Sequence, residues 1–265
     1  MIDIHHHLLF GLDDGARDID VSLAMIDAAV ADGITHIVCT PHSNHRYEFN
    51  PQINEERLNA IRERANGKVT LGLGCDFHLS YDNILDALQH PRKYTINQRQ
   101  YLLVEFADLS IPTSINETFY ELTIAGMRPI ITHPERNGVI QKNPERMEEW
   151  LQSGCLVQIT AGSLTSRFGK TAQILSHRFL EKNWVHFIAT DAHNIESRPP
   201  RMRGAYDIIA KRYGQETADR LCLSNPRAVF LGENMPPQPE GHNLHKDEDE
   251  MPRRKQSLLS RLFSR

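Results

Sequence analysis

The chain has 265 residues, of which 40% are hydrophobic and 24% are charged, and its formal net charge is −4. This composition is typical of an ordinary folded domain and excludes a fibrous or disordered protein for most of the chain. No apolar run approaches the roughly 18 residues that cross a bilayer. The net charge argues against a nucleic-acid-binding protein. Because no secretory signal opens the sequence, we expect a cytoplasmic protein.

Seven short apolar runs rich in β-branched residues predict strands. They cover residues 1–4, 35–40, 69–73, 101–105, 129–132, 156–160 and 186–190. The segments between them carry apolar residues at three- and four-residue spacing, which predicts amphipathic helices. These helices are expected at residues 21–31, 55–65, 115–125, 144–152 and 172–182.

Strand and helix alternate along the chain, which indicates parallel strands with the helices outside. Seven such units favour a closed or distorted (β/α)7 barrel of the TIM type over an open doubly wound sheet. We assign residues 1–232 to this barrel. The four cysteines have irregular spacings that fit no disulfide framework, so we expect reduced core residues.

The composition changes after position 231, where prolines and glycines precede the charged runs KDEDE and RRK. We expect residues 233–265 to be a disordered linker and a basic amphipathic tail. The last segment places apolar side chains on one helical face with arginines opposite. A solvated tail and a helix that binds a partner or the inner membrane surface are the two alternatives.

Metal-binding types of side chain follow six of the seven predicted strands. In chain order these are His5 and His7 with Asp14 in the next loop, His42, Asp76, Glu105, His133, and Asp191 with His193. The carboxyl ends of barrel strands share one mouth. Carboxylates gathered there would repel one another, so divalent metals held by imidazole and carboxylate groups are the simplest explanation.

The motifs DIHHH, DDG, TPH, VEF, HPER and TDAHN followed by RPP carry a family resemblance. With the acidic residue after the third strand, they resemble the PHP (polymerase and histidinol phosphatase) superfamily. They are most similar to its bacterial CpsB/YwqE-type tyrosine phosphatases, over about residues 1–231. The resemblance implies a PHP-fold barrel that holds three divalent metals, manganese first, with iron or zinc as alternatives.

The resemblance also implies ligand sets. His5, His7, Asp76 and Asp191 would hold one metal, Asp76, Glu105 and His133 a second, and Asp14, His42 and His193 a third. Arg136 and Arg198 match the family's phosphate-binding arginines. Asp76 departs from the family, which usually has Glu as the bridge between two metals. We expect the shorter side chain to affect metal preference and rate.

The implied activity is hydrolysis of phosphotyrosine by a metal-activated hydroxide. Arg136 and Arg198 would orient the phosphoryl group, and His42 would assist the leaving group. The implied substrate is the tail of a bacterial exopolysaccharide or capsule tyrosine kinase. A cysteine nucleophile is not indicated, because no cysteine is followed by arginine at the spacing of a C-x5-R loop.

Three other functions fit parts of the pattern. They are a small-molecule phosphatase of the histidinol-phosphate type, an amidohydrolase-type metal enzyme, and a phosphotyrosine-binding module without catalysis. The paired arginines and the DDG loop argue against the amidohydrolase. Around the mouth, we expect Asp3 and Asp13 to be supporting or solvated carboxylates, and Tyr47 and Phe49 to be an aromatic wall or anchors of their loop.

Overall fold

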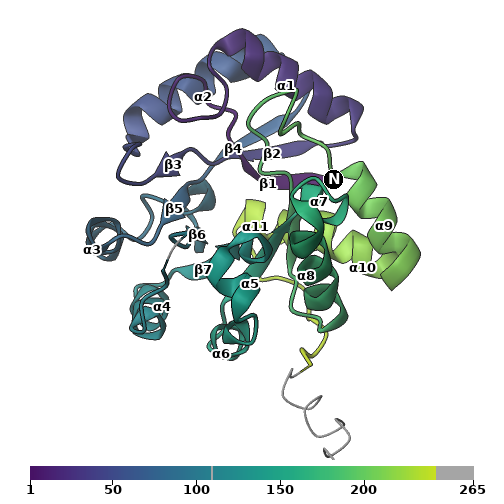
Figure 1. Ribbon diagram of the computed structural model, residues 1–265. Coiled ribbons are helices and arrows are strands. Elements are labelled where there is room, and N and C mark those ends of the chain that lie inside the picture. Colours follow the sequence, from purple (N-terminus) through teal and green to yellow (C-terminus); the bar gives the residue numbers. More distant parts are fainter. Residues whose placement is uncertain (109, 243–265) are drawn as a thin grey trace, which may run out of the picture.

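A computed structural model describes residues 1–108 and 110–242 of the chain (Figure 1). The strands are β1 (Ile2–His6), β2 (His36–Cys39), β3 (His42–Ser43), β4 (Thr70–Leu73), β5 (Asp76–His78), β6 (Tyr101–Glu105), β7 (Arg128–Thr132), β8 (Leu156–Thr160) and β9 (Phe187–Ala189). The α-helices are α1 (Ile19–Ala31), α2 (Pro51–Ala65), α3 (Tyr81–Gln89), α4 (Ile115–Ile124), α5 (Gly138–Lys142), α6 (Arg146–Gln152), α7 (Ala161–Leu164), α8 (Gly169–Glu181), α9 (Arg203–Tyr213), α10 (Gln215–Asp219) and α11 (Asn225–Leu231). Three short helical turns complete the set: η1 (Ile96–Gln98), η2 (Pro134–Arg136) and η3 (Arg220–Ser224).

The strands pair in parallel and follow one another around a circuit. One sheet has the order β1-β2-β4, and the other has the order β3-β5-β6-β7-β8-β9. After short breaks in the chain, β3 and β5 continue the paths of β2 and β4. The circuit closes between β1 and the end of β9, where the amide of Asp191 donates to the carbonyl of His5 and that of His7 to the carbonyl of Ala192, both at 2.9 Å. Seven strand units therefore form the predicted distorted barrel, and Figure 1 shows the helices around it.

The seven predicted strands match β1, β2, β4, β6, β7, β8 and β9, with ends that differ by at most two residues. The five predicted helices match α1, α2, α4, α6 and α8. The sequence pattern missed β3 and β5, because two or three residues are too few to show an alternation.

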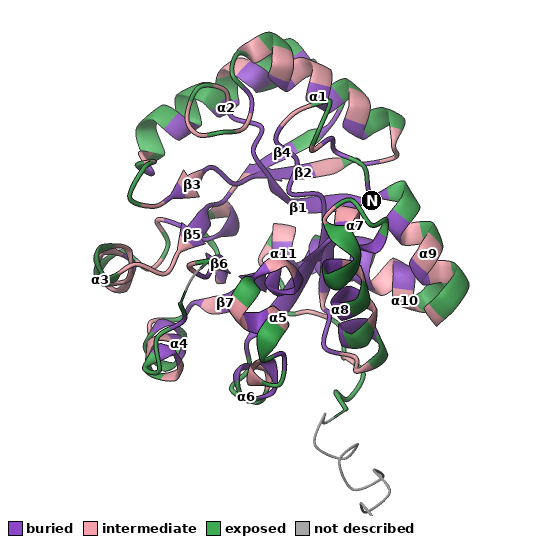
Figure 2. Ribbon diagram, viewed as in Figure 1, coloured by how far each residue is buried: buried purple, intermediate pink, exposed green. Residues whose placement is uncertain are grey.

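Both faces of the strands are buried (Figure 2), as expected for a parallel barrel with outer helices. One apolar cluster fills the barrel interior and includes Leu103, Leu156 and Phe187. Side chains on one face of a strand recur every second residue. Two residues beyond Leu103 and Leu156, the same interior faces therefore carry Glu105 and Gln158. The barrel interior is apolar towards the amino ends of its strands and polar towards their carboxyl ends.

Residues 233–242 have no regular secondary structure but contact the barrel. The indole of Trp184 donates to the carbonyl of His242 at 3.0 Å, and the amide side chain of Asn183 donates to that of Glu240 at 3.2 Å. The rest of the predicted tail, residues 243–265, lies outside the described part of the chain. Within the described residues, no helix is long and apolar enough to cross a membrane. Cys39, Cys75, Cys155 and Cys222 are buried and unpaired.

Candidate metal centre

His5 and His7 point in the same direction from the end of β1, with their Nε2 atoms 3.3 Å apart. The Nδ1 atom of each ring has a hydrogen-bond partner on the side away from the mouth. That of His5 lies 2.9 Å from Oε1 of Gln158, and that of His7 lies 2.8 Å from Oδ2 of Asp13. Both partners are acceptors, so each Nδ1 donates and each Nε2 faces the mouth. Metal-binding histidines are usually oriented in this way.

The strand extensions β3 and β5 place His42 and Asp76 side by side in adjacent strands. The Oδ2 atom of Asp76 lies 3.4 Å from Nε2 of His5 and 3.2 Å from Nδ1 of His42. On its other side, the Nε2 atom of His42 lies 3.4 Å from Oδ1 of Asp14. Asp76, which is fully buried, therefore stands between the imidazoles of β1 and β3.

Glu105 and His133 form the next part of the mouth. Carboxylate oxygens of Glu105 lie 3.7 Å from Nδ1 of His42 and 3.7 Å from Nε2 of His133. His133 has a left-handed backbone with φ of 34°, and it turns the chain from β7 into η2. This turn brings Arg136 back over the mouth, beside the ends of β8 and β9.

Asp191 joins the histidines to both predicted phosphate-binding arginines. Its Oδ1 atom lies 3.5 Å from Nε2 of His5 and 3.4 Å from Nε2 of His7. Its Oδ2 atom accepts hydrogen bonds from Arg136 and Arg198. The ring of His193 points to the other side, with Nε2 3.6 Å from Oδ1 of Asp14.

All nine predicted ligand residues converge in four overlapping groups, in each of which the possible ligand atoms lie within 4.8 Å of one another. The groups are His7, Asp14, His42 and His193; His5, His7 and Asp76; His5, His133 and Asp191; and His42, Asp76 and Glu105. The second and fourth groups share Asp76, which fits a carboxylate between two cations. The assignment of each residue to a particular metal stays a prediction.

Four buried polar atoms of the predicted ligands have no hydrogen-bond partner in the described structure. They are Oδ1 and Oδ2 of Asp76, Nδ1 of His42 and Nε2 of His193. Buried polar atoms without partners are costly and rare in native proteins. Divalent cations would satisfy all four atoms, and imidazole with carboxylate is a donor set that such cations accept. The residues therefore fit metals.

The pKa values of side chains in the mouth show that negative charge is in excess there. Burial favours neutral His5, but Asp76 and Asp191 outweigh it and raise the His5 pKa to about 9. Burial is likewise outweighed at His42, where Asp14 and Asp76 raise the pKa to about 11. Burial, and then the charge of Asp76, raise the pKa of Glu105 to about 8. Protons are thus held by groups that would release them to solvent when metals bind.

Several residues around the mouth support it. Asp13 and Asp3 are supporting carboxylates, as predicted: Asp13 accepts from His7, and Asp3 accepts from the amide of Thr190 at 2.9 Å. Phe49 is buried against Tyr94, with ring centroids 5.1 Å apart, and so anchors its loop. Tyr47 instead stacks on His42, with ring centroids 5.9 Å apart and planes 11° from parallel.

Sequence reasoning missed two supporting residues. Gln158 holds His5, and Phe168 lies beneath Arg136, with its ring centroid 4.2 Å from the guanidinium carbon. An amide inside the otherwise apolar strand LVQIT was the available signal for Gln158. Phe168 gave no signal, because a single aromatic residue in a loop predicts no contact.

A seven-unit barrel with histidines and carboxylates gathered at its strand ends is the arrangement of metal-dependent barrel hydrolases. The chain belongs to the CpsB/CapC family of capsular polysaccharide synthesis, whose family model matches residues 1–231. The resemblance of the motifs is thereby confirmed.

Two relatives cover almost the whole chain. Tyrosine-protein phosphatase YwqE of Bacillus subtilis is 34% identical over 248 residues, which are 90% of this chain and 96% of that protein. Tyrosine-protein phosphatase CpsB of Streptococcus pneumoniae is 32% identical over 240 residues, which are 87% of this chain and 98% of that protein.

Solved structures match as well. A chain from the crystal structures of YwqE and CpsB, described as unique metal-dependent tyrosine phosphatases, matches with a TM-score of 0.84 at 32% identity. The match covers 91% of this chain and 99% of that chain. A lactonase from Listeria monocytogenes matches with a TM-score of 0.57 at 10% identity, which shows a shared fold alone.

Proposed function

We propose that this protein is a metal-dependent protein-tyrosine phosphatase of the CpsB/CapC family. The observation that carries the proposal is the mouth itself, where nine histidine and carboxylate side chains converge beside two arginines. The named relatives are tyrosine phosphatases, and the activity fits a site that gathers cationic groups around one point.

The nine residues would hold three divalent metals in the sets implied by the family, with Asp76 between two of them. Manganese is the proposed ion, with iron and zinc as alternatives. When bound, such cations lower the pKa of water and offset charge on phosphoryl oxygens. Gln158 and Asp13 would keep the Nε2 atoms of His5 and His7 directed at the ions.

Arg136 and Arg198 would bind the phosphoryl group of the substrate. Both guanidinium groups already lie at the mouth, because both donate to Oδ2 of Asp191. With a cation at Asp191, their remaining donors would face the phosphate and hold it by charge-assisted bonds. Stacking on Phe168 would limit the rotation of Arg136 and so fix the orientation of the phosphate.

His42 and Tyr47 would act on the tyrosine side of the substrate. His42 is partly exposed at the mouth and would assist departure of the phenolate oxygen. Tyr47 stacks on His42 and is also partly exposed, so it offers an aromatic face to the substrate ring. A phenolate is a fairly good leaving group, so this assistance would contribute less than the arginines.

We propose as substrate the tyrosine-phosphorylated tail of a bacterial kinase for exopolysaccharide or capsule synthesis. The family description, capsular polysaccharide synthesis, supports this choice. We further propose that residues 1–232 are the catalytic domain in the cytoplasm. Residues 233–265 would then be a tail that can bring the enzyme to the inner membrane surface.

Phosphate release from a phosphotyrosyl peptide and from histidinol phosphate, at equal enzyme and saturating manganese, tests the proposal. We expect a higher kcat/KM for the peptide and no turnover after treatment with EDTA. A preference for histidinol phosphate would favour the small-molecule phosphatase. Peptide binding without turnover, with metals present, would favour a phosphotyrosine-binding module.

A further inference from the structure

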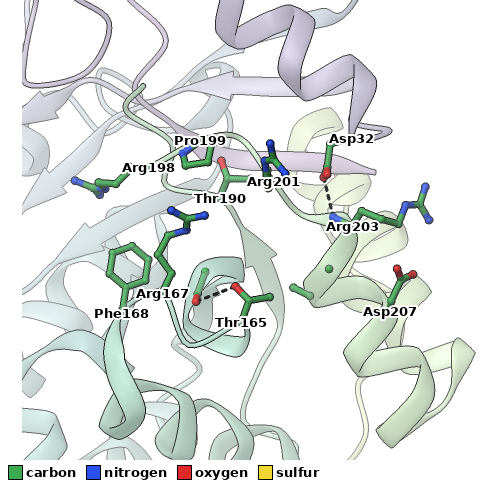
Figure 3. A pocket seen from close by; sticks show the side chains of 13 residues that line it. Asp32, Thr165, Arg167, Phe168, Thr190, Arg198, Pro199, Arg201, Arg203 and Asp207 are labelled. Carbon is green, nitrogen blue, oxygen red and sulfur yellow. Dashed lines mark hydrogen bonds between the residues drawn. The ribbon is translucent and has the colours of Figure 1, made fainter. Parts of the chain in front are cut away.

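A second cavity opens beside the metal mouth (Figure 3). It has a volume of about 380 Å³ and lies between the loop after α7, the segment that follows β9, and the start of α9. Cavities of this size accommodate small ligands or single side chains of a larger one. None of the nine predicted metal ligands lines it.

The charge of this cavity is basic. Its lining includes the arginines Arg167, Arg198, Arg201 and Arg203, against the aspartates Asp32 and Asp207. Asp32 is already engaged, because its Oδ2 atom accepts the backbone amides of Met202 at 2.5 Å and Arg203 at 2.7 Å. Its carboxylate therefore caps the start of α9 and does not neutralise a guanidinium.

Arg167 and Arg201 keep most of their donors free. Arg167 donates from Nη1 to the carbonyl of Ser197 at 2.8 Å, which fixes the side chain and leaves its other donors available. Within the described residues, neither Arg167 nor Arg201 forms an ion pair, and both are exposed. Both side chains line the cavity (Figure 3). The neutral hydroxyl groups there are already paired: Thr165 donates to the carbonyl of Gly162, and Thr190 donates to Asp3.

Two residues connect the cavity to the catalytic mouth. Arg198 lines the cavity, while its guanidinium donates to Asp191 in the mouth. Phe168 also lines the cavity, and its ring stacks with Arg136. The cavity therefore lies next to the proposed binding site of the phosphotyrosine phosphate.

From this arrangement we infer that the cavity is a second anion site, which binds a carboxylate or phosphate on a residue that flanks the phosphotyrosine in the substrate peptide. The inference rests on the proposed phosphatase function and adds a sequence preference to it. Arg167 and Arg201 supply the guanidinium donors, and bidentate contacts to carboxylate or phosphate are the interactions that these donors favour. Two exposed contacts correspond to a preference of about fivefold to tenfold.

Steady-state kinetics of the full-length, manganese-loaded protein tests this inference. The substrates are phosphotyrosyl peptides with one Asp at successive positions on either side of the phosphotyrosine, each matched by a peptide with Asn. At one or more positions, the ratio of kcat/KM for the Asp peptide to that for the Asn peptide should be about five or more. A phosphoserine in place of Asp at that position distinguishes a phosphate site from a carboxylate site.

The variants are Arg167→Gln and Arg201→Gln, with Arg178→Gln on the exposed face of α8 as the matched control. We expect the Asp/Asn ratio to fall towards one in the first two variants and to stay at the wild-type value in the control. Because the ratio is measured within one protein sample, partial misfolding of a variant does not alter it.

An Asp/Asn ratio near one in the wild type at every position would overturn the inference. A ratio that stays at the wild-type value in both Arg167→Gln and Arg201→Gln would overturn it as well. The Asn peptides test the proposed phosphatase separately, since they lack the second anion. If none of the peptides is hydrolysed, the phosphatase proposal fails. In that case, the Asp/Asn ratio of peptide affinities, measured by fluorescence anisotropy, decides whether the anion site exists.

Discussion

Asp76 is the residue on which the proposed metal centre depends most. It is buried, it belongs to two of the four ligand groups, and neither of its oxygens has a hydrogen-bond partner in the described structure. A side chain with only one of these properties would have a structural explanation. Their combination indicates an acidic group that is kept for cations.

We predict that Asp76→Asn, which keeps the shape and removes the charge, lowers the affinity for manganese by more than about tenfold. Metal analysis after dialysis would measure this loss. Asp76→Glu, which introduces the usual residue of the family, is the matched control and should retain metal. Equal metal content in the Asn variant and the wild type would contradict the assigned role.

Arg136 gives a second prediction at the level of single residues. Arg136→Ala removes a charge-assisted contact to the phosphoryl group and should cost about 2 kcal/mol of transition-state stabilisation, a roughly thirtyfold loss of kcat/KM. Lys142→Ala removes an exposed charge at the end of α5, outside the mouth, and is the control. A loss below threefold in Arg136→Ala would exclude Arg136 from phosphate binding.

Individual residues also show which parts of the site could be predicted from the sequence. The nine ligand types could be predicted because carboxyl ends of parallel strands must meet at one mouth, wherever they lie in the chain. The contact between Phe168 and Arg136 could not be predicted, because it depends on how two loops after different strands pack together. Loop packing leaves no periodic pattern in a sequence.

At the scale of the elements, the loop after β1 is fixed by close packing at Gly15. A Cβ atom at this position would lie 2.5 Å from Cβ of His7 and 2.9 Å from Oδ1 of Asp13. His7 is a predicted metal ligand, and Asp13 accepts a hydrogen bond from it. The loop that carries Asp14 can therefore approach β1 only if position 15 has no side chain.

We predict that Gly15→Ala shifts this loop, weakens metal binding and lowers the free energy of unfolding by about 1 to 3 kcal/mol. Urea unfolding together with metal analysis would measure both effects. Gly138→Ala is the control, because the nearest atom to its added Cβ would be 3.9 Å away. If Gly15→Ala retains the metal content and stability of the wild type, the packing argument is wrong.

His186, the residue before β9, makes the free energy of unfolding depend on pH. The amide of Val157 donates to Nδ1 of His186 at 3.1 Å, and burial lowers the pKa of His186 to about 3. The unfolded chain has a histidine pKa of about 6.5. Below that pH the unfolded state binds a proton that the folded state does not. Stability from this group is therefore complete above pH 6.5 and is lost as the pH falls.

Between pH 6 and 4, one such group contributes a slope of up to about 1.4 kcal/mol per pH unit. We predict a shallower slope for His186→Gln, whose side-chain oxygen can still accept from Val157. Urea unfolding at a series of pH values gives both slopes. Identical slopes in the two proteins would show that His186 titrates normally in the folded state.

Some helices and strands could be predicted from their sequences, and others could not. The long strands and amphipathic helices could be predicted because burial on one or both faces imposes a period. β3 and β5 could not, although they carry His42 and Asp76, because both are short continuations after a break in the strand. The ligands on them were nevertheless found, since each follows an apolar run.

For the whole molecule, we expect metal binding and folding to be coupled. The nine predicted ligand residues come from six strand units that are far apart in the chain, so the unfolded chain holds no preformed site. We predict that saturating manganese raises Tm by on the order of 5 °C or more. Thermal unfolding with and without EDTA measures the change. An equal rise in Asp76→Asn would show that manganese acts elsewhere.

The central claim is that the nine side chains at the carboxyl ends of the strands form one multi-metal centre. Anomalous diffraction at the manganese edge, from crystals of this protein grown with manganese, tests it most directly. We predict anomalous peaks among these side chains, with one peak on each side of Asp76. Well-ordered side chains around a mouth without any anomalous peak would contradict the claim.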